Sequence, residues 1–114
     1  MNETLDFYCA EILSGTTPIT VEYESEQVLA YHHTKPSFPT HIVIIPKKHI
    51  DSLVTIQHDD FLVLMEILEV AKELVIKLNL EKDGAKVITN MGKFQDTPHL
   101  HFHLLSGEKY TSFS

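Results

Sequence analysis

The chain has 114 residues, of which 43% are hydrophobic and 22% are charged. These proportions are typical of a globular protein, and the length suits a single domain, residues 1–114, that buries about two-thirds of its unfolded surface. The formal net charge of −7 argues against a nucleic acid partner, because basic surfaces bind a phosphate backbone. A mononucleotide, which needs only a local site, is not excluded.

Cysteine content and hydrophobic patterning indicate the cellular compartment. Cys9 is the only cysteine, so the chain cannot form an internal disulfide or hold zinc with a cysteine cluster. Residues 1–6 lack the basic and apolar regions of a signal peptide, and no uncharged stretch approaches the length that spans a membrane. We therefore expect a cytoplasmic protein without a membrane partner.

The first half of the chain predicts a short helix and then three strands. Gly15 ends an amphipathic segment. Pro18 precedes the first strand, and Pro46 ends the third. The third strand is apolar and β-branched on both faces, which predicts a central position in a sheet. These elements are expected at residues 5–13, 19–23, 28–32 and 41–45, with a short helical turn at 51–54.

A long helix and two further strands follow. Asp59 and Asp60 precede the helical pattern and suit its positive N-terminus. The apolar arc of this helix is wider than one core-facing stripe, which predicts a second copy of the chain as partner, in a homodimer. The helix is expected at residues 61–78 and the strands at 85–90 and 99–105.

The last predicted strand carries three histidines that alternate with apolar residues. Successive side chains of a strand point to opposite faces, so His99, His101 and His103 would share one face, and the other face is apolar. The order of helix, three strands, long helix and two strands predicts an α+β fold. We expect a five-stranded, mostly antiparallel sheet with one long helix and a short N-terminal helix.

Three explanations of the histidine face remain open. A strand face exposed to solvent would more often carry Thr, Lys, Glu or Ser. Alternate histidines can chelate a metal ion, with His41 or Asp96 as a further ligand. In the third explanation, one neutral imidazole attacks a phosphoryl centre while its neighbours donate hydrogen bonds to the phosphate oxygens.

Four blocks of sequence resemble the histidine triad (HIT) family. The run His99-Leu-His101-Phe-His103-Leu-Leu is similar to the family signature. Residues 39–50, which include His41, are similar to the stretch that supplies a fourth histidine in the Hint-like branch. Shorter blocks at residues 24–31 and 87–92 match in the same order, so the resemblance covers nearly the whole chain and implies the HIT-like fold.

The resemblance implies a role for each histidine of the site. His101 would attack the α-phosphorus and carry a covalent nucleotidyl intermediate, which water then hydrolyses. His103 would donate hydrogen bonds to the phosphate, and the carbonyl group of His99 would orient His101. His41 would complete the site. The remaining histidines considered, expected to be structural or exposed, are His32, His49 and His58.

The same resemblance implies contacts with the substrate. Asn90 and Gln95 would contact the phosphate or the leaving group, and Tyr31 lies in a matched block that is expected to bind substrate. Two positions depart from the family pattern. His33 stands where an acid binds ribose, and Asp96 stands where a small hydroxyl residue is common, after a loop shorter than usual.

We therefore expect a hydrolase of nucleoside 5′-phosphoramidates or related nucleoside phosphate derivatives, with no cofactor. Some members of the family hold structural zinc with an N-terminal Cys-x-x-Cys; residues 7–10 offer one cysteine, so we expect no metal there. His103 favours hydrolysis, because nucleotidyl-transferring members carry glutamine at that position. The alternatives are a dinucleoside polyphosphate hydrolase and a non-catalytic module that binds a nucleotide or a metal ion.

Overall fold

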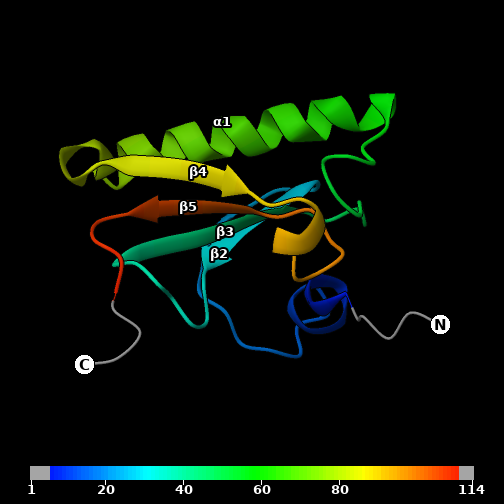
Figure 1. Cartoon of the computed structure of the whole chain (residues 1–114), viewed down its shortest axis with the longest axis horizontal. Coiled ribbons are helices and arrows are strands. Elements are labelled where there is room, and N and C mark those ends of the chain that lie inside the picture. Colours follow the sequence, from blue (N-terminus) through cyan, green and yellow to red (C-terminus); the bar gives the residue numbers. More distant parts are fainter. Residues whose placement is uncertain (1–5, 111–114) are drawn as a thin grey trace.

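A computed structural model describes residues 6–110, and in it five strands form one antiparallel sheet with a long helix on one face (Figure 1). The strand order is β1-β2-β3-β5-β4, and every neighbouring pair is antiparallel. The predicted α+β fold is confirmed. The strands are β1 (Val21–Glu24), β2 (Val28–His32), β3 (Thr40–Pro46), β4 (Ala85–Thr89) and β5 (Phe102–Ser106).

The larger core lies between the sheet and α1 (Phe61–Lys77), which runs along the sheet in Figure 1. Ile42 and Ile44 of β3 and Leu104 of β5 are fully buried against it. Such alternate strand residues share one face, so the sheet presents a continuous apolar surface to the helix. Residues of α1 that are buried in this core are Val63, Ile67, Val70, Ala71 and Leu74.

A smaller core covers the opposite face of the sheet. There the π-helical turn η1 (Tyr8–Ile12), together with residues on either side of it, packs on side chains of β2 and β3 (Figure 1). The central position predicted for β3 is confirmed, because its alternate residues Val43 and Ile45 are buried on this second face. The predicted helix at 5–13 begins one residue before the described part of the chain.

Three predicted elements differ from the structure. The last strand begins at Phe102, not His99, because Leu100 donates its backbone N–H to the Ile50 carbonyl (2.6 Å) and not to a neighbouring strand. Pairing with β3 and β4 starts only at Phe102. The first strand begins at Val21, and residues 51–54 form no helix, with a bend at Leu53 and a turn at Val54.

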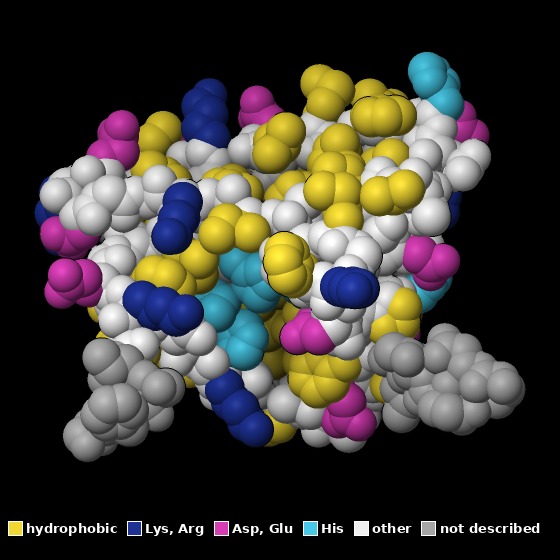
Figure 2. All heavy atoms as spheres, in the orientation of Figure 1, with side chains coloured by type: hydrophobic (Ala, Val, Ile, Leu, Met, Phe, Trp, Pro, Cys, Tyr) yellow, Lys and Arg dark blue, Asp and Glu magenta, His cyan; other side chains and the backbone are white. Residues whose placement is uncertain are grey.

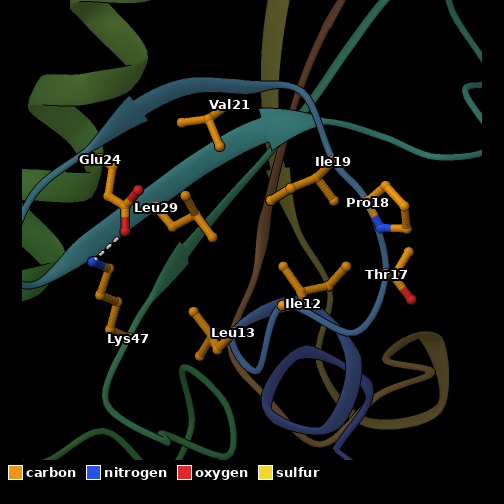
Figure 3. Close-up of a pocket in the computed structure, with 10 residues that line it drawn as sticks. Ile12, Leu13, Thr17, Pro18, Ile19, Val21, Glu24, Leu29 and Lys47 are labelled. Carbon is orange, nitrogen blue, oxygen red and sulfur yellow. Dashed lines mark hydrogen bonds and ion pairs between the residues drawn. The ribbon is translucent and has the colours of Figure 1, made fainter.

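A groove separate from the histidines lies between η1 and the β1 edge of the sheet (Figure 3). Its volume is about 410 Å³, and Lys47 and Glu24 form an ion pair of 2.6 Å at one side. Its other side chains are mostly aliphatic, and no histidine is among the residues that line it. The side chains drawn are Ile12, Leu13, Thr17, Pro18, Ile19, Val21, Glu24, Leu29 and Lys47.

Apolar side chains remain exposed on the outer face of α1. Figure 2 shows hydrophobic side chains gathered over α1 and β4, and β4 is an edge strand. The exposed members are Phe61, Leu62, Met65, Leu68 and Ile76 on α1 and Val87 on β4. Across residues 6–110, none of the helices has the length and apolar character needed to cross a membrane.

Candidate active site

A cleft of about 490 Å³ opens beside the histidines, between η1, the end of β2 and the segment before β5. Figure 2 shows histidine side chains gathered near the middle of the visible face. Five of the predicted site residues line this cleft: Tyr31, His33, Asp96, His101 and His103. Further lining residues, which sequence analysis did not select, include Phe7, Tyr8, Thr17 and Lys35.

His101 has the orientation that a nucleophile needs. Its Nδ1–H donates to the carbonyl oxygen of His99 (2.7 Å), because a carbonyl can only accept. The lone pair of the neutral ring is therefore on Nε2, which faces Asp96 at the cleft. The ring is otherwise buried and lies against the ring of Tyr8, with a centroid distance of 4.9 Å.

A chain of hydrogen bonds fixes the tautomers of His41 and His103. The backbone N–H of Ser37 donates to His41 Nδ1 (3.0 Å), so the ring proton of neutral His41 is on Nε2. This proton is donated to His103 Nδ1 (3.0 Å), and His103 keeps its own proton on Nε2. His103 therefore offers an N–H donor to the cleft that it lines.

Burial keeps both of these histidines neutral. It lowers the pKa of His41 to about 4, and the nearby His33 and His103 rings add to the effect. Burial also lowers the pKa of His103 to about 4, reinforced by His101 and His33. The tautomer assignment requires both rings to be neutral, because each ring must accept a hydrogen bond at Nδ1 and carry its proton on Nε2.

His33 extends the row of imidazoles beyond His41. The two rings stack with centroids 4.3 Å apart and an interplanar angle of 29°. The backbone N–H of Lys35 donates to His33 Nδ1 (2.8 Å), so the acceptor nitrogen of the neutral ring is already used. Burial lowers the pKa of His33. A ligand in the cleft therefore meets this residue as an N–H donor through Nε2, not as an acceptor.

Asp96 places a carboxylate beside the nucleophile. Its Oδ1 lies 3.8 Å from His101 Nε2, and its side chain is 88% exposed. A group bound at His101 would meet this negative charge directly, and a cationic group would be attracted to it. Tyr31, in contrast, is buried at the base of the cleft and lies in the second core.

Two predicted substrate-binding residues are not among those that line the cleft. Gln95 donates its side-chain amide to the carbonyl oxygens of Asp51 (2.7 Å) and Thr97 (2.9 Å), so it holds the loop before His99 in place. Asn90 follows β4 and is half-buried. The Gln95 amide nitrogen is thus used by the backbone, and contact of Gln95 or Asn90 with a substrate stays a prediction.

His99 lies in a second polar cluster, apart from the cleft. Its ring is fully buried, with Nε2 2.9 Å from the Pro46 carbonyl oxygen and Nδ1 2.7 Å from Asp6 Oδ2. Cys9 Sγ lies 3.6 Å from the same Nδ1. His49, expected to be structural or exposed, also contacts the Asp6 carboxylate, and the spacing Asp6-x-x-Cys9 was the available signal in the sequence.

Comparisons with known proteins identify the family of this chain. The HIT domain matches residues 14–110. The chain belongs to the HIT family. A HIT-like protein of Chlamydia trachomatis is 37% identical over 98 residues, which are 84% of this chain and 87% of that protein.

Solved structures of HIT proteins share the whole architecture. A HIT family hydrolase from Legionella pneumophila is 35% identical, with a TM-score of 0.83, and the match covers 96% of this chain and 98% of that one. A histidine triad nucleotide-binding protein from Candida albicans is 27% identical, with a TM-score of 0.79, over 96% of this chain and 82% of that one. The five-stranded sheet with one long helix is thus the HIT-like fold.

Proposed function

We propose that this protein hydrolyses nucleoside 5′-phosphoramidates or related nucleoside phosphate derivatives through a nucleotidyl-His101 intermediate. The observation that carries the proposal is the hydrogen bond from His101 Nδ1 to the His99 carbonyl, which leaves the Nε2 lone pair at the cleft. A neutral histidine fixed in this tautomer presents a nucleophilic nitrogen to a ligand in the cleft.

The reaction has two displacement steps at the α-phosphorus. In the first, His101 Nε2 forms a bond to phosphorus while the bond from phosphorus to the leaving nitrogen breaks, and the amine takes up a proton from solvent in the open cleft. In the second, water attacks the same phosphorus, loses a proton and returns the electron pair to Nε2. The products are the amine and the nucleoside monophosphate.

His103 stabilises the charge that develops on the phosphate oxygens. Its Nε2–H is the free end of the chain that runs from the Ser37 backbone through His41. A donor already oriented in a mostly buried site needs no reorganisation as the reaction proceeds, and such donors are typically worth about 2.7–4 kcal/mol. His41 acts as a positioning residue, because it fixes the direction of this donor.

The family relatives and the third triad histidine support hydrolysis and the Hint-like branch. One relative is described as a HIT family hydrolase, and another as a nucleotide-binding protein. His103 stands where nucleotidyl-transferring members have glutamine, and residues 39–50 are similar to the Hint-like sequence. The single cysteine fits a reducing cytoplasm, where we place the reaction.

Trapping the intermediate tests the proposal. A reaction with isotopically labelled adenosine 5′-phosphoramidate, quenched within one turnover, should give a peptide in which His101 carries the labelled adenylyl group by mass spectrometry. Binding of AMP without any turnover or labelled peptide would favour the non-catalytic module. Faster cleavage of diadenosine polyphosphates than of phosphoramidates would favour the second hydrolase class.

We further propose that the exposed face of α1 and the β4 edge bind a second copy of this chain. Exposed apolar side chains continue from α1 onto β4 (Figure 2), and an unpaired edge strand can extend a sheet across a two-fold axis. Sedimentation at micromolar concentration should give twice the chain mass of 13.0 kDa. Leu62→Glu should shift the protein towards the monomer, and a wild-type monomer would contradict the proposal.

A further inference from the structure

We propose that a hollow beside the cleft binds a second phosphate group, carried on the ribose of the substrate. This substrate class rests on the proposed function, and it comprises nucleoside 5′-phosphate derivatives that also bear a 2′- or 3′-phosphate. The hollow has a volume of about 480 Å³ and shares Thr17, His33 and Thr34 with the cleft. It therefore continues the cleft past His33 and is not a separate cavity.

His33 stands where the cleft and the hollow meet, and it supplies a free N–H group. Its Nδ1 accepts the backbone N–H of Lys35 (2.8 Å), so the proton of the neutral ring is on Nε2. Within residues 6–110 this Nε2–H has no acceptor, although every buried polar side-chain atom there has a partner. The Nε2–H group is thus open to solvent, and an incoming acceptor finds the donor already oriented.

Lys35 brings a positive charge to the same end of the cleft. Its side chain is exposed and lines the cleft, and its ammonium group forms no ion pair with another described residue. Figure 2 shows basic side chains at the border of the exposed histidine group. An unpaired ammonium group beside a free N–H donor suits a phosphate, because hydrogen bonds between charged groups are stronger than neutral ones.

The lining of the hollow adds further hydrogen-bonding groups and no negative charge. The hydroxyl-bearing residues Thr20 and Thr34 line it, and His32 does so too. No Asp or Glu of the described chain is among the lining residues. A phosphate in the hollow would therefore meet hydroxyl and imidazole groups together with the charge of Lys35.

Two carboxylates contact residues of the hollow, and both already have partners. Glu22 accepts from His32 Nε2 (2.9 Å) and pairs with Lys77 (3.1 Å), so a basic group offsets its charge. Glu11 accepts the hydroxyl group of Thr17 (2.8 Å). Neither carboxylate belongs to the lining of the hollow or of the cleft.

The charges at the two ends of the cleft indicate which part of the substrate carries the second phosphate. Asp96 Oδ1 lies 3.8 Å from His101 Nε2, so an anionic leaving group would meet a negative charge there. The ring of His33 lies near the ring of His103, with a centroid distance of 6.3 Å. The ribose adjoins the 5′-phosphate that His103 would contact, and its 2′- and 3′-oxygens can carry a phosphate towards His33.

Binding of nucleotides that have no amine leaving group tests this site without any turnover. Titration calorimetry should give a Kd for adenosine 3′,5′-bisphosphate or 2′,5′-bisphosphate at least about tenfold lower than for AMP, the value of one hydrogen bond to a charged group. The isomer that binds more tightly identifies the ribose position.

The other outcomes separate this inference from the proposed function. Equal Kd values for AMP and both bisphosphates would overturn the second phosphate site and leave the proposed function intact. ADP that binds as tightly as the better bisphosphate would place the second anion on the leaving-group side and overturn the ribose assignment. No binding of any of these nucleotides would contradict both.

Variants assign the donors. Lys35→Ala should lower the preference for the better bisphosphate over AMP by about tenfold, whereas Lys35→Arg should keep it. His33→Phe retains a ring to stack on His41 but removes the donor, so it should also lower the preference. The matched control is Lys72→Ala, which removes the same charge from α1 and should leave the preference unchanged. An unchanged preference in both Lys35→Ala and His33→Phe would overturn the proposal.

Discussion

His99 and His101 are two residues apart, yet their imidazoles lie in opposite chemical environments. His101 keeps one nitrogen free for a ligand in the cleft, whereas both nitrogens of His99 are used inside the protein. Near His101 the neighbouring rings are neutral, because burial lowers the pKa of His41 and His103. Near His99 a carboxylate dominates: burial raises the pKa of Asp6, but hydrogen bonds from Cys9 and His99 outweigh it and hold it at about 2.

The difference shows that a regular motif can serve two purposes at once. The alternation of the histidine run sets which side of the backbone each ring occupies, but the segments packed against that side decide its chemistry. For His101 the neighbour is a cleft; for His99 it is Asp6 and Cys9, which precede it by more than 80 residues. The variants below change one environment while leaving the other intact.

The largest effect is expected from His101→Ala. Loss of a covalent nucleophile should lower kcat for an AMP phosphoramidate by at least about a thousandfold. The circular dichroism spectrum should be retained, because this ring belongs to neither of the two apolar cores. The control is His58→Ala, which removes an exposed histidine away from the cleft. Turnover of His101→Ala within tenfold of wild type would show that another group attacks phosphorus.

The next largest effect concerns ribose recognition at His33. Because its Nδ1 is occupied by the Lys35 backbone N–H, His33 cannot accept a hydrogen bond from a ribose hydroxyl as an acid would. We expect weak discrimination between matched AMP and dAMP phosphoramidates. His33→Asp should raise the ribose preference in kcat/KM by about tenfold to a hundredfold, the value of one charge-assisted hydrogen bond.

A strong ribose preference in the wild type would show that another group replaces the family acid. The matched control is His33→Asn, which is similar in size to Asp but carries no charge. It separates the effect of charge from that of removing the ring stacked on His41.

A smaller effect is expected at Asp96. Its carboxylate near His101 Nε2 should attract a cationic leaving group and repel a further phosphate. Asp96→Ser should lower the kcat/KM ratio of an alkylammonium-bearing phosphoramidate to a diadenosine polyphosphate by about tenfold, a moderate loss because the side chain is mostly exposed to solvent. The same ratio in Asp96→Asn, which keeps the shape, should fall equally; no change in either variant would exclude Asp96 from specificity.

The smallest effect is on stability against acid. Burial lowers the pKa of His41 and His103 from an ordinary value of 6.5 to about 4. Between pH 6.5 and pH 4 the unfolded chain therefore binds protons at these two residues that the native chain does not bind. Their contribution to the free energy of unfolding is therefore greatest above pH 6.5 and decreases as the pH falls towards 4. We expect a loss on the order of 1 kcal/mol per histidine.

Urea denaturation at pH 7.5 and pH 5 measures this loss, and His41→Gln should reduce it. An unfolding free energy that rises on acidification would contradict the assigned neutral tautomers. Asp6 contributes little to this difference, because its pKa is lowered from 3.8 to about 2 and it titrates below pH 5.

The sequence predicted the sheet, the long helix and the core alternation, because these depend on local periodicity. Leu100, Phe102 and Leu104 are buried in the core under α1 as expected, even though the strand starts at Phe102. The start was misplaced because Leu100 pairs with Ile50, a residue far away in the sequence. No local pattern reports such a contact.

The site was predicted in part for the same reason. His101, His103 and His41 were selected by motif, and the structure brings them together. Tyr8 and Phe7 were missed, because they reach the cleft only through the packing of η1 on the far face of the sheet. The cluster of Asp6, Cys9, His49 and His99 was missed because it joins residues spread over more than 90 positions, and only one of its members is a cysteine.

The strand order has a consequence for how the protein is made. Within residues 6–110, β5 is the last strand in sequence but lies inside the sheet, between β3 and β4. Until residues 102–106 have left the ribosome, β4 has no partner and one edge of β3 is unpaired. The sheet therefore cannot form completely, and His103 cannot reach His41. The sheet can therefore be completed only after β5 has been synthesised, and a nascent chain halted after β4 would expose an unpaired β4 and one free edge of β3 to chaperones.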